Sequence, residues 1–442
     1  MSAALLTDKY ELTMLAAALR DGTAGRRTTF EVFARRLPDG RRYGVVAGTG
    51  RLLEALGEFV FDDEALAPLA AFLDSNTLDY LRDFRFGGDI DGYPEGELYF
   101  PGSPVLSVTG SFAECVLLET LALSILNHDS AIASAAARMA SAAAGRPLIE
   151  MGSRRTHEYA AVAAARAAYL AGFTGTSNLE ANRRYGVPAI GTSAHAFTML
   201  HTTGAVPGDG PLGRGTDEWE RAAFRAQVDA LGIATTLLVD TYDVTAGVAN
   251  AIAVAGTGLG AVRIDSGDLG VLARRVRTQL DELGATGTQI VVSGDLDEYS
   301  IAALRADPVD SYGVGTSVVT GSGAPTASMV YKLVEVDGLP VEKRSSRKES
   351  HGGRKSALRL SRPTGTVTEE LIHPVSQPLE VAEPARVLTV PLVRGGQVLA
   401  APDLAAARAR VAEGLRSLPW EGLALSAGEP AIPTRQVPVR AR

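Results

Sequence analysis

The feature that most constrains the fold is a regular alternation of short apolar segments and amphipathic helical patterns in the middle of the chain. Short apolar strands that are separated by amphipathic helices are typical of consecutive β/α units, which build a parallel sheet through right-handed crossovers. The predicted strands are 147–150, 188–192, 235–240, 261–264, 289–293 and 311–314. The predicted helices are 156–171, 217–231, 244–255, 269–283 and 297–306.

Every predicted strand ends in a polar or glycine-rich group of residues. An open, doubly wound sheet needs such residues only at its switch point, whereas a closed barrel can use the end of each strand. The distribution therefore predicts an α/β fold with an irregular (β/α) barrel. The polar groups are 150–155, 191–195, 240–243, 263–268, 293–295 and 313–317.

The two ends of the chain have a different pattern, in which strand-like segments are separated by turn residues. This pattern predicts a second α+β domain, in which both chain ends pair in an antiparallel-rich sheet. We expect this domain to consist of 1–110, completed by about 328–442, and the barrel of 111–327 to carry most of the active site. The strand-like segments are 28–36, 89–109, 330–336, 357–360, 367–371 and 387–391.

Composition excludes several classes of protein. The 442 residues carry a net charge of -8, which argues against a nucleic-acid partner, since such a protein needs a dominant basic face. The single cysteine, Cys115, lies in an apolar stretch, where we expect it to pack as a small hydrophobe. One cysteine cannot form an internal disulfide, and no targeting segment or membrane-spanning stretch is visible. We therefore expect a cytoplasmic protein with no membrane partner.

The stretch 263–268 is the most informative polar group. It places Arg263, Asp265, Ser266 and Asp268 at one strand end. A guanidinium suits a planar carboxylate or a phosphate, which it can bind with two parallel hydrogen bonds. The alternative is a structural one, in which Asp265 or Ser266 is only a helix N-cap beside a surface salt bridge.

Two further strand ends carry candidate residues. His195 follows a strand end, and its ring could accept a phosphoryl group if an acceptor held the other nitrogen. Asp240, at the end of the next strand, is the candidate acceptor, and a purely structural histidine is the alternative. Backbone N–H groups around Gly315 and Thr316 could cradle a phosphate, although the same pattern also occurs in ordinary tight turns. No His/Cys pattern has metal-ligand spacing, so we expect no protein-bound metal site.

Taken together, these motifs make the chain similar to the nicotinate phosphoribosyltransferases, a branch of the type II phosphoribosyltransferases. The pieces occur in the order of that family and span most of the chain. Many members have Phe at the position of Met151 and Asn at the position of Gly294, and the first difference concerns the pocket for the pyridine ring. The matching segments are 6–14, 150–155, 191–197, 239–243, 263–268 and 313–317.

The resemblance implies an irregular α/β barrel, an N-terminal domain completed by later chain, and a homodimer with shared active sites. It implies an ATP-dependent, ligase-type enzyme of NAD biosynthesis that joins nicotinate to 5-phosphoribosyl 1-diphosphate. The products would be nicotinate mononucleotide and diphosphate, with ADP and phosphate formed through a phosphohistidine. ATP would be a co-substrate and Mg²⁺ the cofactor that accompanies the diphosphate.

The resemblance also implies roles for individual residues. Arg263 would face the nicotinate carboxylate, and Arg154 or Arg155 would clamp that carboxylate or a phosphate. Tyr10 would cover the pyridine ring from the neighbouring subunit, unless it only packs beneath the N-terminal helix. The other predicted substrate contacts are Thr192, Ser266, Asp268, Gly294, Gly315 and Thr316, and the predicted catalytic residues are His195, Asp240 and Asp265.

Three alternatives stay open at this point. The chain could transfer the phosphoribosyl group to nicotinamide or to quinolinate, or it could be a non-catalytic scaffold that binds phosphoribosyl diphosphate.

A dense basic run, 343–355, is either a solvated hairpin or a guide for polyphosphates.

Overall fold

The computed structural model describes residues 2–203, 216–343, 351–377, 379 and 384–437. The chain forms two units, of which the first comprises Met1–Ala137 and Ala324–Arg442 and the second comprises Arg138–Gly323. The first unit is therefore built from both chain ends, as the turn and strand pattern predicts.

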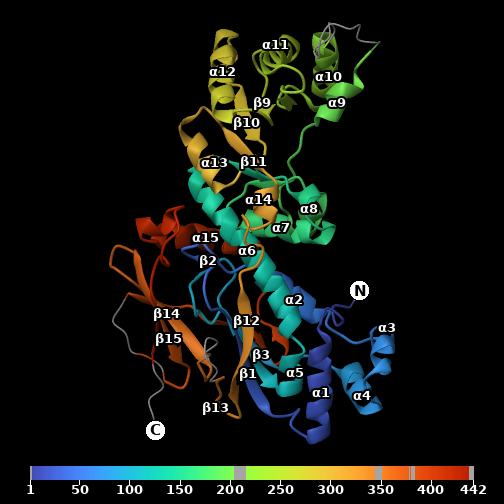
Figure 1. Cartoon of the computed structure of the whole chain (residues 1–442), viewed down its shortest axis with the longest axis vertical. Coiled ribbons are helices and arrows are strands. Elements are labelled where there is room, and N and C mark those ends of the chain that lie inside the picture. Colours follow the sequence, from blue (N-terminus) through green and yellow to red (C-terminus); the bar gives the residue numbers. More distant parts are fainter. Residues whose placement is uncertain (1, 204–215, 344–350, 378, 380–383, 438–442) are drawn as a thin grey trace. The chain divides into compact units, whose positions relative to one another are not determined.

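An antiparallel sheet organises the first unit (Figure 1). The long strand β1 pairs with β5 on one side and with β12, from the other end of the chain, on the opposite side. Phe30 on β1 stacks on Tyr331 of β12 with 4.8 Å between the ring centroids, so an aromatic pair joins the two chain ends inside the core. The strand order is β13 (Leu339–Pro340), β12 (Met329–Val336), β1 (Arg27–Ala34), β5 (Leu106–Ser111), β3 (Asp89–Gly92), β17 (Val390–Arg394) and β18 (Gln397–Val398).

A second sheet and a set of helices complete this unit. The buried guanidinium of Arg359 on β14 binds Glu97 at 2.6 Å and Glu370 at 2.5 Å, which satisfies three charges that would otherwise be costly to bury. The sheet has the order β16 (Ala385–Val387), β14 (Lys355–Ser361), β15 (Val367–Pro374) and β19 (Thr434–Gln436), and β2 (Gly44–Val45) pairs with β4 (Leu98–Tyr99). The helices are α1 (Lys9–Asp21), α2 (Thr49–Gly57), α3 (Asp63–Leu66), α4 (Ser75–Asp83), α5 (Phe112–Val116), α6 (Glu119–Ala143) and α15 (Leu404–Ser417), with short 3-10 turns η1 (Ala67–Ala71) and η4 (Trp420–Leu423). The last part of α6, from Arg138 onward, belongs to the second unit.

The second unit contains a six-stranded, wholly parallel sheet. The sheet forms an irregular half-barrel, so the predicted α/β fold class is confirmed. Its end strands β7 and β8 do not pair with each other among the described residues. The order is β7 (Gly175–Thr176), β6 (Leu148–Glu150), β11 (Ser311–Val314), β10 (Gln289–Ser293), β9 (Ala261–Ile264) and β8 (Thr236–Leu238).

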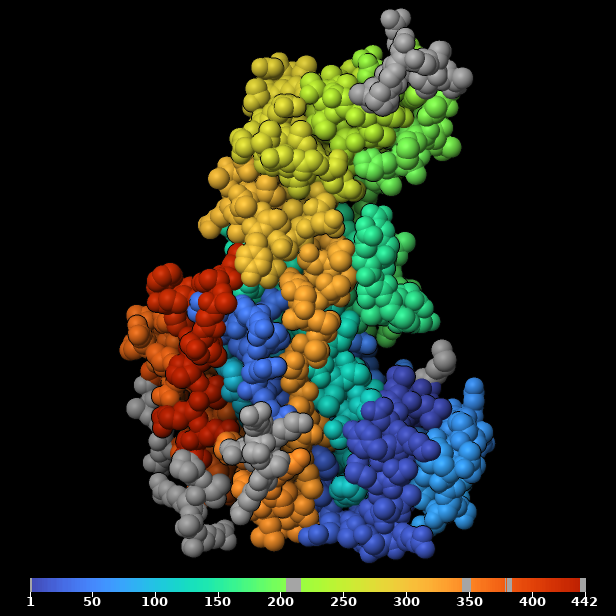
Figure 2. Space-filling model, in the orientation of Figure 1, coloured from blue at the N-terminus to red at the C-terminus, as the bar shows by residue number. Residues whose placement is uncertain are grey.

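Helices alternate with these strands, and α10, α11 and α12 lie side by side (Figure 1). In the space-filling view, residues of these three helices form one continuous block of yellow and green surface (Figure 2). Side-chain caps from Asp243 and Asp268 begin α11 and α12, which places both helix N-termini directly after strand ends. The helices are α7 (Glu158–Leu170), α8 (Leu179–Tyr185), α9 (His195–Leu200), α10 (Thr216–Leu231), α11 (Val244–Ala255), α12 (Leu269–Glu282), α13 (Glu298–Ala303) and α14 (Thr316–Val319), with 3-10 turns η2 (Ser153–Arg155) and η3 (Leu304–Ala306).

The structure corrects one predicted domain boundary and one predicted strand. The barrel was expected from residue 111, but the chain up to Ala137 belongs to the first unit, because residues of α5 and early α6 pack in that unit's core. The predicted strand 188–192 is also wrong, since this segment makes only an isolated bridge between Ala189 and Thr176. The two-residue strand β7, which was not predicted, pairs instead with β6 at the edge of the sheet.

Cys115 is fully buried and free, and burial raises the pKa of its thiol to about 12, as expected for a packed small hydrophobe. No helix in the described part of the chain is long and apolar enough to cross a membrane.

Most of the basic run lies outside the described residues, which resume at 351. Its final two cations are committed to ion pairs: Arg354 binds Asp91 at 2.5 Å, and Lys355 binds Glu31 at 2.8 Å. These two side chains have a structural role within the first unit.

Candidate functional site

The candidate site lies at the carboxyl edge of the parallel sheet. Because β6, β8, β9, β10 and β11 are parallel, the residues that follow them emerge at the same edge. Arg263 on β9 sits in register between Leu238 of β8 and Val291 of β10, so it lies near the middle of this edge.

An ion pair supported by a hydroxyl joins β9 to β10. The Nη2 of Arg263 donates to Asp265 Oδ1 at 3.1 Å, and its Nε donates to Ser293 Oγ at 2.9 Å. Ser293 in turn donates to the same Asp265 oxygen. The side chains of Arg263 and Asp265 are 13% and 28% exposed, so the pair is shielded on the protein side and open on the other.

This arrangement keeps Asp265 charged. Burial raises the pKa of Asp265, but the hydrogen bond from Ser293 and the charge of Arg263 outweigh that effect, and the net pKa is lowered. Within the described residues, Nη1 of Arg263 and Oδ2 of Asp265 form no hydrogen bond, so both atoms can meet a ligand.

Asp240 connects this pair to the end of β8. Its Oδ2 accepts hydrogen bonds from the backbone N–H of Asp265 at 2.9 Å and from Ser266 Oγ at 2.7 Å. Its side chain is only 1% exposed, and its Oδ1 has no hydrogen-bond partner among the described residues. A buried carboxylate oxygen without a donor is costly, which marks this atom as one that serves a ligand or a moving side chain.

His195 lies on the open side of that carboxylate. Its Nε2 is 3.8 Å from Asp240 Oδ1, and its Nδ1 is 3.1 Å from Thr241 Oγ1. The structure thus brings the predicted pair together at a distance too long for a hydrogen bond. The partner within hydrogen-bond distance is Thr241, which sequence reasoning missed although it lies in the recognised segment 239–243.

Asp268 is the N-cap of α12, a role for which Asp265 and Ser266 were the candidates in the sequence. Its side chain accepts from the backbone N–H of Val271 at 3.1 Å and caps α12, so neither Asp265 nor Ser266 is the N-cap. Its position directly before the predicted helix start was the signal that could have identified it.

The backbone after β9 approaches position 294 so closely that only a glycine fits there. Its φ is +115°, and a Cβ at this position would lie 2.5 Å from the carbonyl oxygen of Asp265. Gly294 therefore brings the end of β10 against the end of β9. It was predicted as a substrate contact, and the structure gives it a role in shaping this turn.

The glycine turn after β11 lies beside the segment that follows β6. A Cβ at Gly313 would lie 2.7 Å from the sulfur of Met151, so this glycine makes room for the methionine. Gly315 precedes α14, and the Thr316 side chain is exposed. The turn therefore presents backbone and a hydroxyl to solvent, as a phosphate cradle requires.

Arg154 and Thr192 are both exposed on loops of the second unit. Neither Arg154 nor Arg155 forms an ion pair within the described part of the chain. The charge of Arg263 is already paired with Asp265. Among the described residues, Arg154 and Arg155 are therefore the cations without an ion pair that lie nearest in sequence to the carboxyl end of a strand of the parallel sheet.

Tyr10 belongs to the first unit, where it lies on the first turn of α1 and is 44% exposed. Burial and the carboxylates of Glu119 and Glu11 raise the pKa of its hydroxyl, so it is a neutral phenol at neutral pH. Its ring is available to a partner, which a tyrosine packed beneath the helix would not be.

The described residues contain no group of three or more His, Cys, Asp or Glu side chains that could hold a metal ion. The side chains that could meet a ligand-borne cation are Asp265, through its Oδ2, and Asp240, through its Oδ1.

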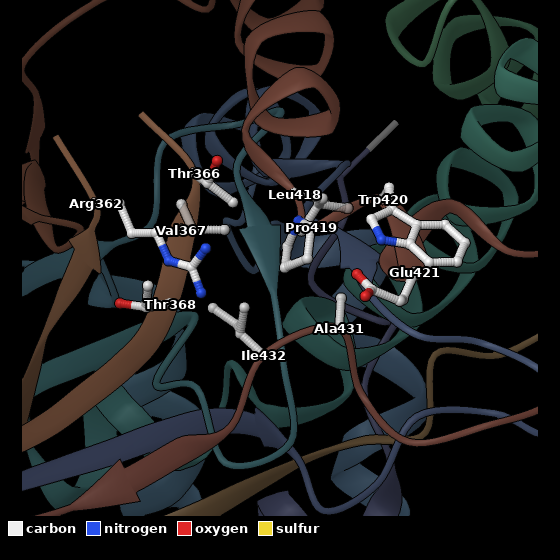
Figure 3. Close-up of a pocket in the computed structure, with 10 residues that line it drawn as sticks. All are labelled: Arg362, Thr366, Val367, Thr368, Leu418, Pro419, Trp420, Glu421, Ala431 and Ile432. Atoms are coloured by element: carbon white, nitrogen blue, oxygen red, sulfur yellow. The ribbon is translucent and has the colours of Figure 1, made fainter. Parts of the chain in front are cut away.

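A separate pocket of about 530 Å³ lies in the first unit. Figure 3 shows Arg362 and Glu421 at opposite ends of a lining whose middle is apolar, formed by Val367, Pro419 and Ile432. None of the predicted site residues lines this pocket.

Comparison with known proteins supplies the family. Residues 5–127 match the model of the nicotinate phosphoribosyltransferase N-terminal domain, and residues 147–368 match that of the nicotinate phosphoribosyltransferase family. The chain belongs to the nicotinate phosphoribosyltransferase family.

Individual relatives agree with this assignment. The chain is 76% identical over 436 residues to nicotinate phosphoribosyltransferase pncB1 of Mycobacterium tuberculosis, covering 99% of this chain and 96% of the relative. The structure is similar to that of human nicotinic acid phosphoribosyltransferase, with a TM-score of 0.81, 29% identity and coverage of 96% of both chains. It is also similar to nicotinate-nucleotide pyrophosphorylase from Pyrococcus furiosus, with a TM-score of 0.75, 26% identity and coverage of 94% of this chain and 95% of that one.

One titratable group near the site was not anticipated. Glu220 on α10 is 1% exposed, and its Oε2 accepts from Asn250 of α11 at 2.9 Å. The pKa of Glu220 is raised to about 7, chiefly by burial. The hydrogen bond from Asn250 opposes this shift, and the nearby carboxylates of Asp217, Asp243 and Asp240 add to it.

Glu220 makes the stability of the protein depend on pH. Its folded-state pKa of about 7 exceeds the usual 4.5, so this group lowers the free energy of unfolding as the pH rises from about 4.5 to 7. We expect Glu220→Gln to become more stable relative to the parent between pH 5 and 8, by roughly 1–3 kcal/mol. Urea unfolding at both pH values measures the difference. The exposed Glu218→Gln on the same helix is the control, and an unchanged difference would contradict the role of Glu220.

Proposed function

We propose that this chain transfers the 5-phosphoribosyl group of 5-phosphoribosyl 1-diphosphate to the ring nitrogen of nicotinate. The products are nicotinate mononucleotide and diphosphate, and the reaction feeds NAD biosynthesis. The observation that carries the proposal is the half-buried Arg263, which keeps an unused nitrogen at the strand edge of a chain 76% identical to a nicotinate phosphoribosyltransferase.

The reaction breaks the C1–O bond of the ribose while positive charge builds on the ring, so the protein contributes mainly position and electrostatics. Arg263 Nη1 grips the nicotinate carboxylate, while Nε and Nη2 stay fixed to Ser293 and Asp265. The Asp265 carboxylate, kept ionised, binds ribose hydroxyls and faces the growing positive charge. Backbone N–H groups at Gly315 and Thr316 take the 5′-phosphate.

Mg²⁺ accompanies the diphosphate in this proposal. The donor set fits such a role, because Mg²⁺ commonly keeps its waters and uses one or two protein carboxylates together with substrate phosphates. Asp265 is the residue that would hold it, through water, and the ion would offset the charge of the leaving diphosphate.

ATP enters through His195. A proton on Nε2 directed at Asp240 leaves the lone pair on Nδ1, which attacks the γ-phosphorus of ATP as the Thr241 hydroxyl turns away. ADP leaves, and water later takes the phosphoryl group from the histidine. The carboxylate of Asp240 stabilises the cationic ring that this exchange requires.

The working form proposed here is a cytoplasmic homodimer with shared active sites, in which Tyr10 of one subunit covers the pyridine ring bound by its partner. The exposure of the Tyr10 ring supports this arrangement.

Arg263 is expected to decide the choice of substrate. Arg263→Lys keeps a positive charge beside Asp265, but a single ammonium group cannot contact Ser293, Asp265 and nicotinate together as a guanidinium can. The KM for nicotinate should therefore rise about tenfold or more. The parent should turn over nicotinate in preference to nicotinamide and quinolinate at equal concentration, because an amide leaves the guanidinium unpaired. Arg275→Lys, on the exposed face of α12, is the control. A parent that prefers nicotinamide or quinolinate would overturn the assignment, and inactivity on all three would favour a binding scaffold.

His195→Ala should abolish ATP hydrolysis and the stimulation of product formation by ATP, while leaving a slow ATP-independent transfer. Radioactive γ-phosphate should label the parent through an acid-labile bond and should not label the variant. His157→Asn, at an exposed position that caps α7, should behave like the parent. Unchanged ATP coupling in His195→Ala would refute the phosphohistidine.

Mixing inactive variants tests the shared site. Tyr10→Ala removes the ring that one subunit gives to a site, and Arg263→Met removes the guanidinium that the other subunit gives to it. Mixed dimers should therefore contain one intact site and regain part of the parental activity. Activity that never exceeds the average of the two variants would exclude a shared site, and a fully active Tyr10→Ala would exclude the role of that ring.

A further inference from the structure

Glu150, the last residue of β6, has no role in the reaction as derived above, yet it is one of the most deeply buried acids of the second unit. Its side chain is 1% exposed. Burial raises its pKa, while hydrogen bonds from Thr176 and Gly152 oppose that effect. A buried carboxylate held only by neutral donors is expensive, so its retention calls for a specific use.

The two carboxylate oxygens are both engaged, and they hold two different loops. Oε1 accepts from the backbone N–H of Gly152, and Oε2 accepts from the hydroxyl of Thr176 at the end of β7. The Glu150 carbonyl also accepts from Ser177 N–H at 2.8 Å. The carboxylate is thus one of the links between the segment after β6 and the segment after β7.

These contacts close into a ring. Thr176 Oγ1 accepts from the backbone N–H of Asn178 at 2.9 Å, and the Asn178 side chain donates to Ser153 Oγ at 3.0 Å. Ser153 lies in the same loop as Gly152, so the path returns to its start. Two of the steps, Gly152 to Glu150 and Asn178 to Ser153, hold the 151–155 loop, and the others join the ends of β6 and β7 to the cap of α8.

The ring leaves the two arginines outside it. Arg155 N–H donates to Gly152 O at 2.8 Å, which forms the tight turn η2, and the side chains of Arg154 and Arg155 are exposed. A Cβ at Gly152 would lie 3.0 Å from the carbonyl oxygen of Gly315, so the same loop is also set against the glycine turn after β11.

We propose that Glu150 is a positioning residue, which fixes the 151–155 loop through Gly152 and Thr176 so that Arg154 meets the anionic substrate. The proposal rests on the proposed function, because it assumes that Arg154 binds an anionic group of nicotinate or of 5-phosphoribosyl 1-diphosphate. Arg154 is the group that touches substrate, and Glu150 acts through it.

The chemistry of the ring explains why a carboxylate is needed. Gly152 N–H and the Thr176 hydroxyl both donate, so the residue at 150 must accept at both of its terminal atoms. A glutamine has one acceptor oxygen and one donor nitrogen. With that oxygen on Gly152, the NH2 group faces Thr176, whose hydroxyl proton then loses its acceptor, so the contact with the end of β7 is weakened. A displacement of about 1 Å at a binding group can cost about a hundredfold in rate.

A double-mutant cycle tests the proposal. We expect Glu150→Gln to lower kcat/KM about tenfold or more, chiefly through the KM of the substrate that Arg154 binds. Because Glu150 acts through Arg154, the same change in an Arg154→Met background should cost less than about threefold. Additive losses would overturn the proposal, as would an Arg154→Met variant with parental kinetics.

Thr176 supplies a matched pair of variants that change the same contact from the other side. Thr176→Val removes the hydroxyl at nearly constant volume and should reproduce the KM effect of Glu150→Gln. Thr176→Ser keeps the hydroxyl and should restore parental kinetics. Equal behaviour of the two Thr176 variants would contradict the ring.

Amide hydrogen exchange separates this proposal from the proposed function. Exchange in the 151–155 loop should quicken in Glu150→Gln and Thr176→Val but not in Thr176→Ser, whatever the enzyme turns over. Faster exchange in a protein that has no activity on nicotinate would refute the proposed function alone. Unchanged exchange would refute the role of Glu150 even in a fully active enzyme.

Discussion

The ion pair between Arg263 and Asp265 is the interaction on which the candidate site depends. The shared hydroxyl of Ser293 fixes both partners at the junction of two parallel strands, and Asp240 fixes the backbone of Asp265 from a third. Such a pair, shielded on one side only, keeps both charges in place without satisfying all their hydrogen-bonding atoms. The guanidinium is thereby oriented before any ligand arrives, which lowers the entropic cost of binding.

The same pair limits what Arg263 can do alone. Its charge is largely balanced by Asp265, and Asp240 adds a further carboxylate to this edge. The proposed site for an aromatic acid and a sugar diphosphate therefore needs further cations, and in our proposal the exposed guanidinium groups of the 151–155 loop supply them within the second unit. The rigidity of that loop then matters as much as that of the strand itself.

Much of the second unit could be predicted from the sequence. Strands β9, β10 and β11 and helix α11 have the predicted bounds, because short apolar segments between caps and glycines leave few alternatives. The strand predicted over 188–192 was wrong. Its apolar residues have the pattern of a strand, but β7 is the segment that pairs with β6. Local pattern cannot show which of two neighbouring segments a sheet will accept.

The arrangement of the candidate site could likewise be predicted only in part. Arg263, Asp240 and His195 were expected to lie together because parallel strands bring their ends to one edge, and the structure does place them there. The contacts of Thr241 and Glu150 depend on side-chain geometry that no spacing reveals.

The pairing of β1 with β12 has a consequence for biosynthesis. All of the second unit is translated between these two strands, so β1 leaves the ribosome long before its outer neighbour exists. Until then the nascent sheet presents an unsatisfied edge, of the kind that invites association with other chains. The inserted unit has a continuous sequence and its own parallel sheet, so it can mature first, and the amino-terminal unit must wait for the tail of the polypeptide before it closes.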